Sequence, residues 1–358
     1  GNINTKPKSE VLAKQNIEDK TVGYIAEWKS MANAKFLARL LELNIQVRAT
    51  TKPFQIENVS YDRGSLVMAK TNNEHIAFDS LVVATANEFE VKLTPTTTGF
   101  SNSGTDFGSP DIKKIHPQRI AVLRGKGTSS LSYGSLWYFF EQELNYPIIS
   151  ISTEDFGGLD LDDYDVLVLP NGYYSSLLND KKLKELSSWI KSGGKVIAIA
   201  NALSSFEGKK GFGLEKVKTE KDTTVANLSP YAEREKESTK NNITGAIFQV
   251  KVDNTHPLAF GYEKTYASLK TSSAAYQDLK EGYNVAYFDD TSERLSGFAG
   301  EKASEKISKS LVFGEQRLGR GSIVYMVDDV MFRSFWENGK LFFVNALFMV
   351  NNRSQTFR

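Results

Sequence analysis

The stretch KVIAIANAL at residues 195–203 constrains the fold of this chain more than any other. A Gly193-Gly194 break precedes it, apolar and β-branched residues follow, and the chain then turns at Asn201. Such a run predicts a buried central strand of a parallel sheet. Ligands and catalytic groups of open α/β sheets lie beyond the carboxyl ends of these strands. Asn201 carries an amide, which is neither a nucleophile nor a base at ordinary pH, so the turn argues against an enzyme.

Composition excludes several classes of protein. The 358 residues are enough for two domains, and 44 Lys and Arg against 43 Asp and Glu leave a net charge of +1, which favours no nucleic-acid partner. No apolar run approaches the roughly 20 residues that span a bilayer. The chain has no cysteine, and His75, His116 and His256 belong to no HxxH, HxxE or HExxH pattern. We therefore expect no metal site and no cofactor.

The first third of the chain predicts a small domain. Residues 1–20 form a polar lead-in without a signal peptide, and Gly1 in place of Met suggests a piece of a longer protein. A strand at 21–28, a helix at 32–43 and a strand at 45–49 give a β-α-β start to a small α/β domain over 21–93. Residues 94–117 are rich in Thr, Ser, Gly and Pro, which predicts a linker or a covering loop.

Residues 118–358 alternate strands and helices in the manner of a parallel α/β sheet with helices on both faces. The expected strands are 120–123, 148–151, 164–169, 195–203, 247–252, 284–287, 310–314 and 322–327, and the expected helices are 136–144, 180–191 and 332–350. Residues 207–242 are rich in Lys, Glu, Thr and Asn, and they predict a solvated insertion.

The loops that follow these strands supply the candidate ligand-binding residues. They are Arg124, Tyr133, Asn171, Gly172, Tyr173 and Asn201. The glycine-rich loop 124–133 matches neither a P-loop nor GxGxxG. Each candidate has a structural alternative: Arg124 pairs with a surface carboxylate, the tyrosines pack, and the Asn201 amide caps the following segment.

Two other features carry weaker hypotheses. His256 lies in the segment DNTHP, which favours an Asx turn before a proline over a catalytic role. The paired acids Asp289-Asp290 and Asp328-Asp329 come at strand ends, but no EF-hand spacing supports a calcium site.

The order of elements from residue 118 onward resembles a class I glutamine amidotransferase-like domain. That flavodoxin-like fold is shared with PfpI-type proteases and trehalose-utilisation-like proteins. The family carries a cysteine in a Gly-x-Cys-x-Gly turn where this chain has Asn201, and no histidine follows residues 322–327. The resemblance therefore does not extend to the residues of glutamine hydrolysis.

Four stretches resemble the C-terminal, non-peptidase region of secreted bacterial zinc carboxypeptidases of the carboxypeptidase A type. They are IAVLRGKGTSSLSYGSLWYFFEQEL, DYDVLVLPNGYY, THPLAFGY and FRSFWENGKLFFVNALF. This resemblance implies a periplasmic or extracellular, catalytically inert region that positions an attached zinc peptidase domain or binds its substrate or partner. The alternative is a module that binds a peptide or small molecule at the carboxyl edge of the sheet. A third hypothesis is a hydrolase that uses Ser204 or Ser205.

Overall fold

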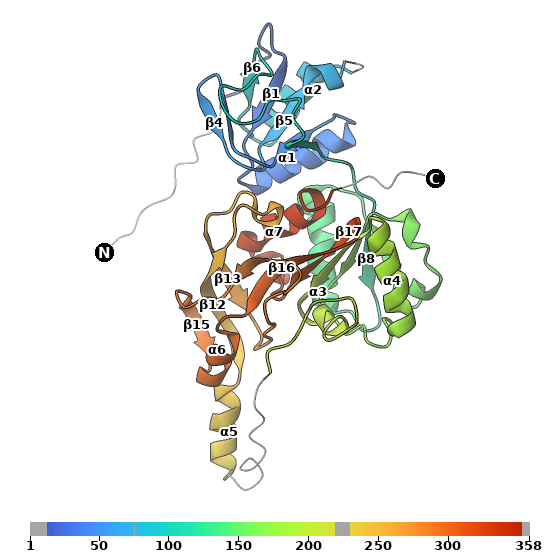
Figure 1. Cartoon of the computed structure of the whole chain (residues 1–358), viewed down its shortest axis with the longest axis vertical. Coiled ribbons are helices and arrows are strands. Elements are labelled where there is room, and N and C mark those ends of the chain that lie inside the picture. The colour runs from blue at the N-terminus through green and yellow to red at the C-terminus, as the bar shows by residue number, and fades with distance from the viewer. Residues whose placement is uncertain (1–12, 75, 219–229, 353–358) are drawn as a thin grey trace, which may run out of the picture. The chain divides into compact units, whose positions relative to one another are not determined.

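The computed structural model describes residues 13–74, 76–218 and 230–352 (Figure 1). Contacts divide the chain into two compact units, Gly1–Ile115 and His116–Arg358. The division falls inside the predicted linker 94–117. Most of the predicted lead-in, residues 1–12, lies outside the described residues, as does His75.

The first unit is built on an antiparallel sheet with the strand order β6-β1-β5-β2-β7. Its strands are β1 (Gly23–Ala26), β2 (Arg48–Thr50), β5 (Leu66–Ala69), β6 (Thr94–Thr96) and β7 (Ile112–Lys114), and its helices are α1 (Met31–Glu42) and α2 (Phe78–Glu88). A separate hairpin joins β3 (Phe54–Ile56) and β4 (Val59–Tyr61). The predicted β-α-β start is present as β1-α1-β2, but β5 lies between the two strands and pairs with both.

Side-chain alternation in β1 explains how both faces of this sheet are covered. Tyr24 points toward α2, where its ring lies 5.8 Å from the ring of Phe78. Ile25 points the other way and packs with Phe54 and Tyr61 of the hairpin. The sheet is therefore covered on both sides, which gives the first unit its own core.

The predicted linker 94–117 is wrong in part, because it supplies both edge strands of this sheet. β6 pairs with β1, and β7 pairs with β2. β6 contains Pro95, which an edge strand tolerates because one side of its backbone needs no partner. The Thr- and Pro-rich composition predicted a loop, whereas these residues include the short edge strand β6.

The second unit contains a ten-stranded sheet. Its strands are β8 (Ile120–Arg124), β9 (Ile149–Ser152), β10 (Val166–Leu169), β11 (Lys195–Ile199), β12 (Ile243–Val252), β13 (Thr265–Lys270), β14 (Tyr283–Tyr287), β15 (Glu293–Ala299), β16 (Leu311–Leu318) and β17 (Gly321–Met326). Its α-helices are α3 (Ser130–Tyr138), α4 (Asp180–Ser192), α5 (Tyr231–Lys240), α6 (Glu301–Ile307) and α7 (Glu337–Phe348). A π-helical turn, Phe139–Leu144, continues α3.

One half of this sheet confirms the predicted parallel α/β core. β9, β8, β10, β11 and β17 are parallel neighbours in that spatial order. Numbered along the chain, the order is 2-1-3-4-5, which is the flavodoxin-like order. The strand order reverses between β8 and β10, so the crevice at the carboxyl ends of these two strands is the expected ligand position.

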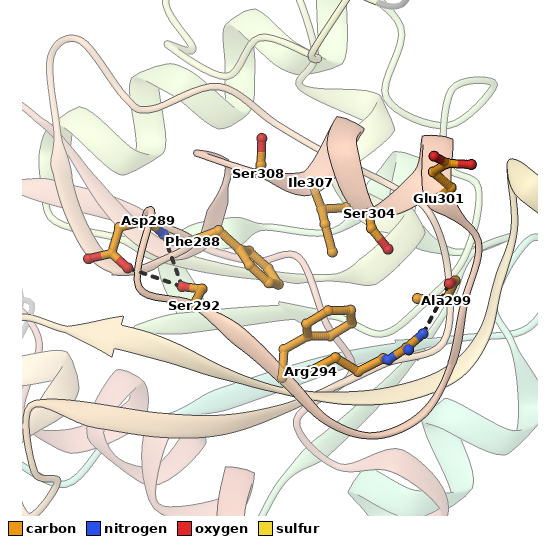
Figure 2. A pocket seen from close by; sticks show the side chains of 10 residues that line it. Phe288, Asp289, Ser292, Arg294, Ala299, Glu301, Ser304, Ile307 and Ser308 are labelled. Carbon is orange, nitrogen blue, oxygen red and sulfur yellow. Dashed lines mark hydrogen bonds between the residues drawn. The ribbon is translucent and has the colours of Figure 1, made fainter.

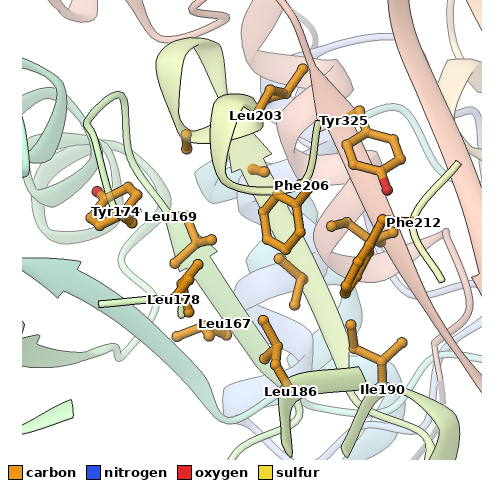
Figure 3. Packing of buried hydrophobic residues seen from close by; sticks show 14 of the residues in the cluster. Leu167, Leu169, Tyr174, Leu178, Leu186, Ile190, Leu203, Phe206, Phe212 and Tyr325 are labelled. Carbon is orange, nitrogen blue, oxygen red and sulfur yellow. The ribbon is translucent and has the colours of Figure 1, made fainter. Parts of the chain in front are cut away.

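The two faces of the parallel core carry different helices, as the alternation in β11 shows. Val196 and Ala198 belong to a buried cluster with Leu186 and Ile190 of α4, part of which Figure 3 shows. Lys195 points to the opposite face, where its ammonium group contacts carbonyl oxygens at the end of α7. α4 begins where the Asn179 side chain accepts from the N–H groups of residues 181 and 182, and it ends at Gly193, whose φ is 133°.

The other half of the sheet is antiparallel, which the predicted parallel sheet does not include. β16 pairs antiparallel with β17, and β14 and β12 follow. β12 also pairs with both β13 and β15. The sheet is thus parallel on the side of β11 and antiparallel beyond β17.

The predicted solvated insertion 207–242 is packed over its first part. Phe212 and Leu214 are buried, and the ring of Phe206 lies 4.9 Å from the ring of Phe212 (Figure 3). Gly213 N–H donates to Gln316 Oε1 of β16 at 2.8 Å. The isolated aromatic and leucine residues among many charges anchor this segment to the sheet. Residues 219–229 lie outside the described residues.

Candidate functional site at the carboxyl edge of the parallel strands

The turn after β11 is strained at Ala200. Its φ is 51°, a left-handed conformation that costs a non-glycine residue of order 1 kcal/mol or more. A short 3₁₀ segment, Ala200–Ser205, follows the strand directly. The sharp strand-to-helix turn that exposes a side chain in some α/β enzymes is therefore present in outline, and the residue at its apex carries only a methyl group.

The predicted position of Asn201 needs a correction, because the apex is one residue earlier. The expectation that the Asn201 amide caps the following segment is also wrong, since that segment has no side-chain cap. Asn201 instead contributes its backbone: its N–H donates to Asn171 Oδ1 at 3.2 Å, and its carbonyl accepts from Ser204 Oγ at 2.7 Å. The turn is thereby tied to the loop after β10.

The two loops at the reversal of strand order are joined to each other by backbone hydrogen bonds. Ser129 N–H donates to the Asn171 carbonyl at 2.8 Å, and Tyr173 N–H donates to the Gly127 carbonyl at 2.8 Å. The approach is so close that a Cβ on Gly172 would lie 2.4 Å from the Gly127 carbonyl oxygen. Glycine is required there, and the bonded loops span the gap between β8 and β10.

Ser132 joins three segments at this edge. It lies in the first turn of α3, is buried, and its Oγ accepts from Asn171 N–H at 3.1 Å. The same side chain lies close to Asp329, which follows β17, and lowers the pKa of its carboxyl group. Burial is the main cause that raises the pKa of Asp329, and the nearby Asp328 adds to it. A hydroxyl, a carboxyl group and the Asn171 amide therefore converge from α3, β10 and β17.

The remaining predicted site residues take three different positions. Arg124 is exposed and forms no ion pair with any carboxylate that the structure describes, so the predicted surface salt bridge is not observed there. The Tyr133 hydroxyl lies 2.6 Å from Ser150 Oγ and ties α3 to β9. Tyr173 is 66% exposed, whereas Tyr174 is buried and its hydroxyl contacts the Pro170 carbonyl. One tyrosine packs and its neighbour faces solvent.

Sequence reasoning missed Ser132, Ala200 and the role of Asp329. Asp329 stood out as one of two acids after a strand, and its neighbour Asp328 is held separately by Lys270 at 2.9 Å and by Ser268 at 2.7 Å. Ser132 gave no signal, because a serine in the first turn of a helix is common.

The structure also bears on the hypotheses about His256 and about a metal site. Thr255 N–H donates to Asp253 Oδ1 at 3.0 Å, which confirms the predicted Asx turn before Pro257. His256 itself is buried, accepts from Leu258 N–H at Nδ1, and has Nε2 2.9 Å from Glu315 Oε2. Across residues 13–74, 76–218 and 230–352, no three His, Asp or Glu side chains converge as a metal-binding group.

The chemistry available at this edge is hydrogen bonding. Ser132, Asn171 and Asp329 offer donors and acceptors, and Ala200 offers none. Ser204 uses its hydroxyl on the Asn201 carbonyl, and the Ser205 hydroxyl is buried without a partner among the described residues. No helix in the described part of the chain is both long and apolar enough to cross a membrane.

Comparisons with known proteins give structural similarity alone. No protein-family model and no curated protein matches the chain. A ThuA-like protein from Bacteroides uniformis is 12% identical over 64% of this chain and 89% of its own, with a TM-score of 0.38. A GMP synthase component from Thermoplasma acidophilum is 13% identical over 65% and 94%, with a TM-score of 0.40. A glutamine amidotransferase from Thermotoga maritima is 12% identical over 60% and 77%, with a TM-score of 0.36. At these values the fold assignment rests on the strand order of this chain itself.

Proposed function

We propose that this chain is a catalytically inert accessory region of a zinc carboxypeptidase-like protein, which positions the peptidase or binds its substrate or partner. The observation that carries the inert part is the β11 turn. Its strained residue is Ala200, and the next residue, Asn201, uses its backbone to bond the neighbouring loop. Nucleophilic catalysis requires a nucleophile with a base in hydrogen-bond reach, and neither residue of the turn supplies one.

A second observation supports a scaffold. The loops after β8 and β10 bond each other through Ser129, Asn171 and Tyr173, so backbone groups that an open crevice would offer to a ligand are already paired. The link to a peptidase is supported by the four stretches that resemble the non-peptidase region of secreted zinc carboxypeptidases. The proposed periplasmic or extracellular location has the same support.

Hydrolysis assays test the inert part. The purified chain is incubated with glutamine and with a nitrophenyl ester, and we expect turnover no faster than in buffer. Saturable turnover that disappears in Asn201→Ala or in Ser132→Ala, with the thermal melting point of each variant checked, would contradict the proposal. Turnover that persists in both variants comes from a contaminant or from another site.

The partner is tested by mixing the chain with a zinc peptidase domain of the carboxypeptidase A type from the same organism. We expect either a complex on size exclusion or a change in kcat/KM for long peptide substrates, while a dipeptide substrate serves as the control. The accessory role would be excluded if no complex formed and kcat/KM did not change, both in the mixture and in a covalent fusion.

A small-molecule binding module at the same edge is the second candidate. The observation in its favour is the set of polar groups around Ser132 and Asp329, flanked by the exposed Tyr173 and by Arg124, which lacks an ionic partner among the described residues. A thermal-shift screen of polar metabolites tests it. A stabilising ligand must lose its effect in Arg124→Gln and Tyr173→Ser and keep it in Arg320→Gln, which changes an exposed arginine outside this edge.

A further inference from the structure

A pocket of about 480 Å³ lies in the antiparallel half of the second unit, on different elements from the carboxyl-edge site (Figure 2). Residues of β12, β15 and α6 and the segment that follows β14 line it. Its volume is in the range of sites that hold small organic ligands. No part of the proposed function involves this pocket.

The middle of the pocket is apolar. The rings of Phe248 and Phe288 meet edge to face, with centroids 5.4 Å apart and planes at 75°. Both rings and the side chain of Ile307 are buried, and Figure 2 shows Ile307 above the ring of Phe288. An apolar side chain of a ligand would gain contact with aromatic edges and faces here.

A β-bulge brings a cation beside this apolar surface. The register between β12 and β15 shifts, so that Ile247 pairs with Ser296 and Phe248 pairs with Arg294. One extra residue, Leu295, lies between them, and bulges of this kind redirect side chains near functional sites. The shift sets Arg294 directly across from Phe248, at the wall of the pocket.

Arg294 retains donors for a ligand. Its Nη1 donates to the Ala299 carbonyl at 3.2 Å, and the residue as a whole is exposed. Within the described residues no carboxylate lies within ion-pair distance of it. A guanidinium group carries five N–H donors in a planar fork that suits a carboxylate. Most of that capacity is therefore available at the pocket.

A carboxylate stands at the same end of the pocket. Glu301 and the Arg294 guanidinium group lie on the side of Ala299, away from Asp289 (Figure 2). Glu301 is exposed and forms no ion pair with any residue that the structure describes. Asp289, at the other end, is occupied by Thr291, whose N–H and hydroxyl donate to it at 2.9 and 2.7 Å. Only one end of the pocket thus offers both charges to a ligand.

We propose that this pocket binds an α-amino acid with an aromatic or branched apolar side chain. The α-carboxylate meets Arg294, the α-ammonium group meets Glu301, and the side chain packs on Phe248 and Phe288. A simple carboxylate would bring a like charge to Glu301, and a simple amine would bring one to Arg294. A zwitterion pairs with both Arg294 and Glu301, and this complementarity favours an amino acid over a simple carboxylate or a simple amine.

Calorimetric titration with L-phenylalanine at neutral pH tests the proposal. We expect saturable binding, and we expect 3-phenylpropionate and phenethylamine, which each lack one charged group, to bind at least about tenfold more weakly. Absence of saturable L-phenylalanine binding, or equal binding of the three compounds, would overturn the proposal.

Variants locate the site. Arg294→Gln and Glu301→Gln each change an exposed side chain, so both proteins should fold, and each should weaken L-phenylalanine binding by about tenfold. Ser308→Phe should fill the pocket from the exposed end of α6 and abolish binding. Arg320→Gln, at an exposed arginine away from the pocket, is the matched control and should bind as the unmodified chain does. Binding that survives all three pocket variants would place the amino acid elsewhere and reject the site.

Discussion

The ammonium group of Lys195, the first residue of β11, lies 2.7 Å from the carbonyl oxygen of Ala346 near the end of α7. It also donates to the carbonyls of Leu347 at 2.8 Å and Val350 at 2.6 Å. Ala346 and Leu347 carry two of the last carbonyls of α7, which have no partner within the helix, and Val350 lies just beyond its end. A lysine with about 1% of its surface exposed therefore closes the end of α7 against the sheet.

Replacing Lys195 with Met should destabilise the second unit strongly. The substitution keeps an unbranched side chain of similar length, but it leaves three buried carbonyl oxygens without their donor. Each unsatisfied buried group costs of the order of 1–3 kcal/mol, so we expect a loss of at least about 2 kcal/mol. Urea unfolding measures it, and Lys191→Met, at an exposed lysine of α4, is the control. Equal stability of the two variants would show that α7 ends without help from Lys195.

The same lysine predicts a pH dependence. Burial lowers the pKa of Lys195 from 10.5 to about 7, against the opposing influence of Glu315 and Asp165. Between these values the unfolded chain holds a proton that the folded chain has released, and the neutral amine, with two N–H groups, then donates to only two of the three carbonyls. The contribution to stability is therefore complete above pH 10.5 and is lost as the pH falls toward 7, with a slope of up to roughly 1.4 kcal/mol per pH unit. Unfolding curves from pH 7 to 10 should show this slope in the Lys191→Met control and lose it in Lys195→Met.

The core of the second unit was predictable because its signals are local. Residues 195–199 form a buried strand, which the apolar run after two glycines predicts. The two ends of α4 are also visible in the sequence, because Asn179 caps its start and Gly193 follows its last residue. β15 was missed, because its residues from Glu293 to Phe298 are exposed and their alternation carries no apolar face. A strand that pairs at the rim of a sheet needs no buried side.

The candidate site was predictable only as a location. The strand ends drew attention to Asn171 and Asn201, which the structure joins by a hydrogen bond. The contact of Ser132 with Asp329 depends on the packing of α3 against the segment after β17, which no local pattern reveals. The left-handed backbone of Ala200 was also hidden, because alanine gives no sign of a positive φ.

The loop junction at the reversal of strand order predicts opposite effects for two glycines. At Gly172 a new Cβ would lie 2.4 Å from the Gly127 carbonyl oxygen, so Gly172→Ala should force the loops apart and destabilise the unit by about 1–3 kcal/mol. At Gly134, inside α3, no atom lies within 4 Å of a new Cβ, and alanine favours a helix over glycine by up to about 1 kcal/mol. Urea unfolding of Gly134→Ala should therefore show equal or greater stability. Similar behaviour of both variants would mean that the loops separate without cost.

Asp329 predicts the opposite sign of pH dependence from Lys195. Its pKa is raised, chiefly by burial, so the folded chain holds a proton that the unfolded chain releases at about pH 4. The stability that Asp329 contributes is complete below that pH and is lost as the pH rises through the raised value.

Asparagine imitates the neutral acid and can still accept from Met331 N–H, which lies 3.1 Å from Asp329 Oδ1. Asp329→Asn should thus match the unmodified chain near pH 4 and exceed its stability increasingly above that pH, by about 1.4 kcal/mol for each unit of pKa shift. Thermal melts across this range measure the difference, and Asp290→Asn, at an exposed carboxylate, is the matched control. A variant that is less stable at every pH would show that the Asp329 carboxylate is ionised and bound, which would reverse the assignment of its proton.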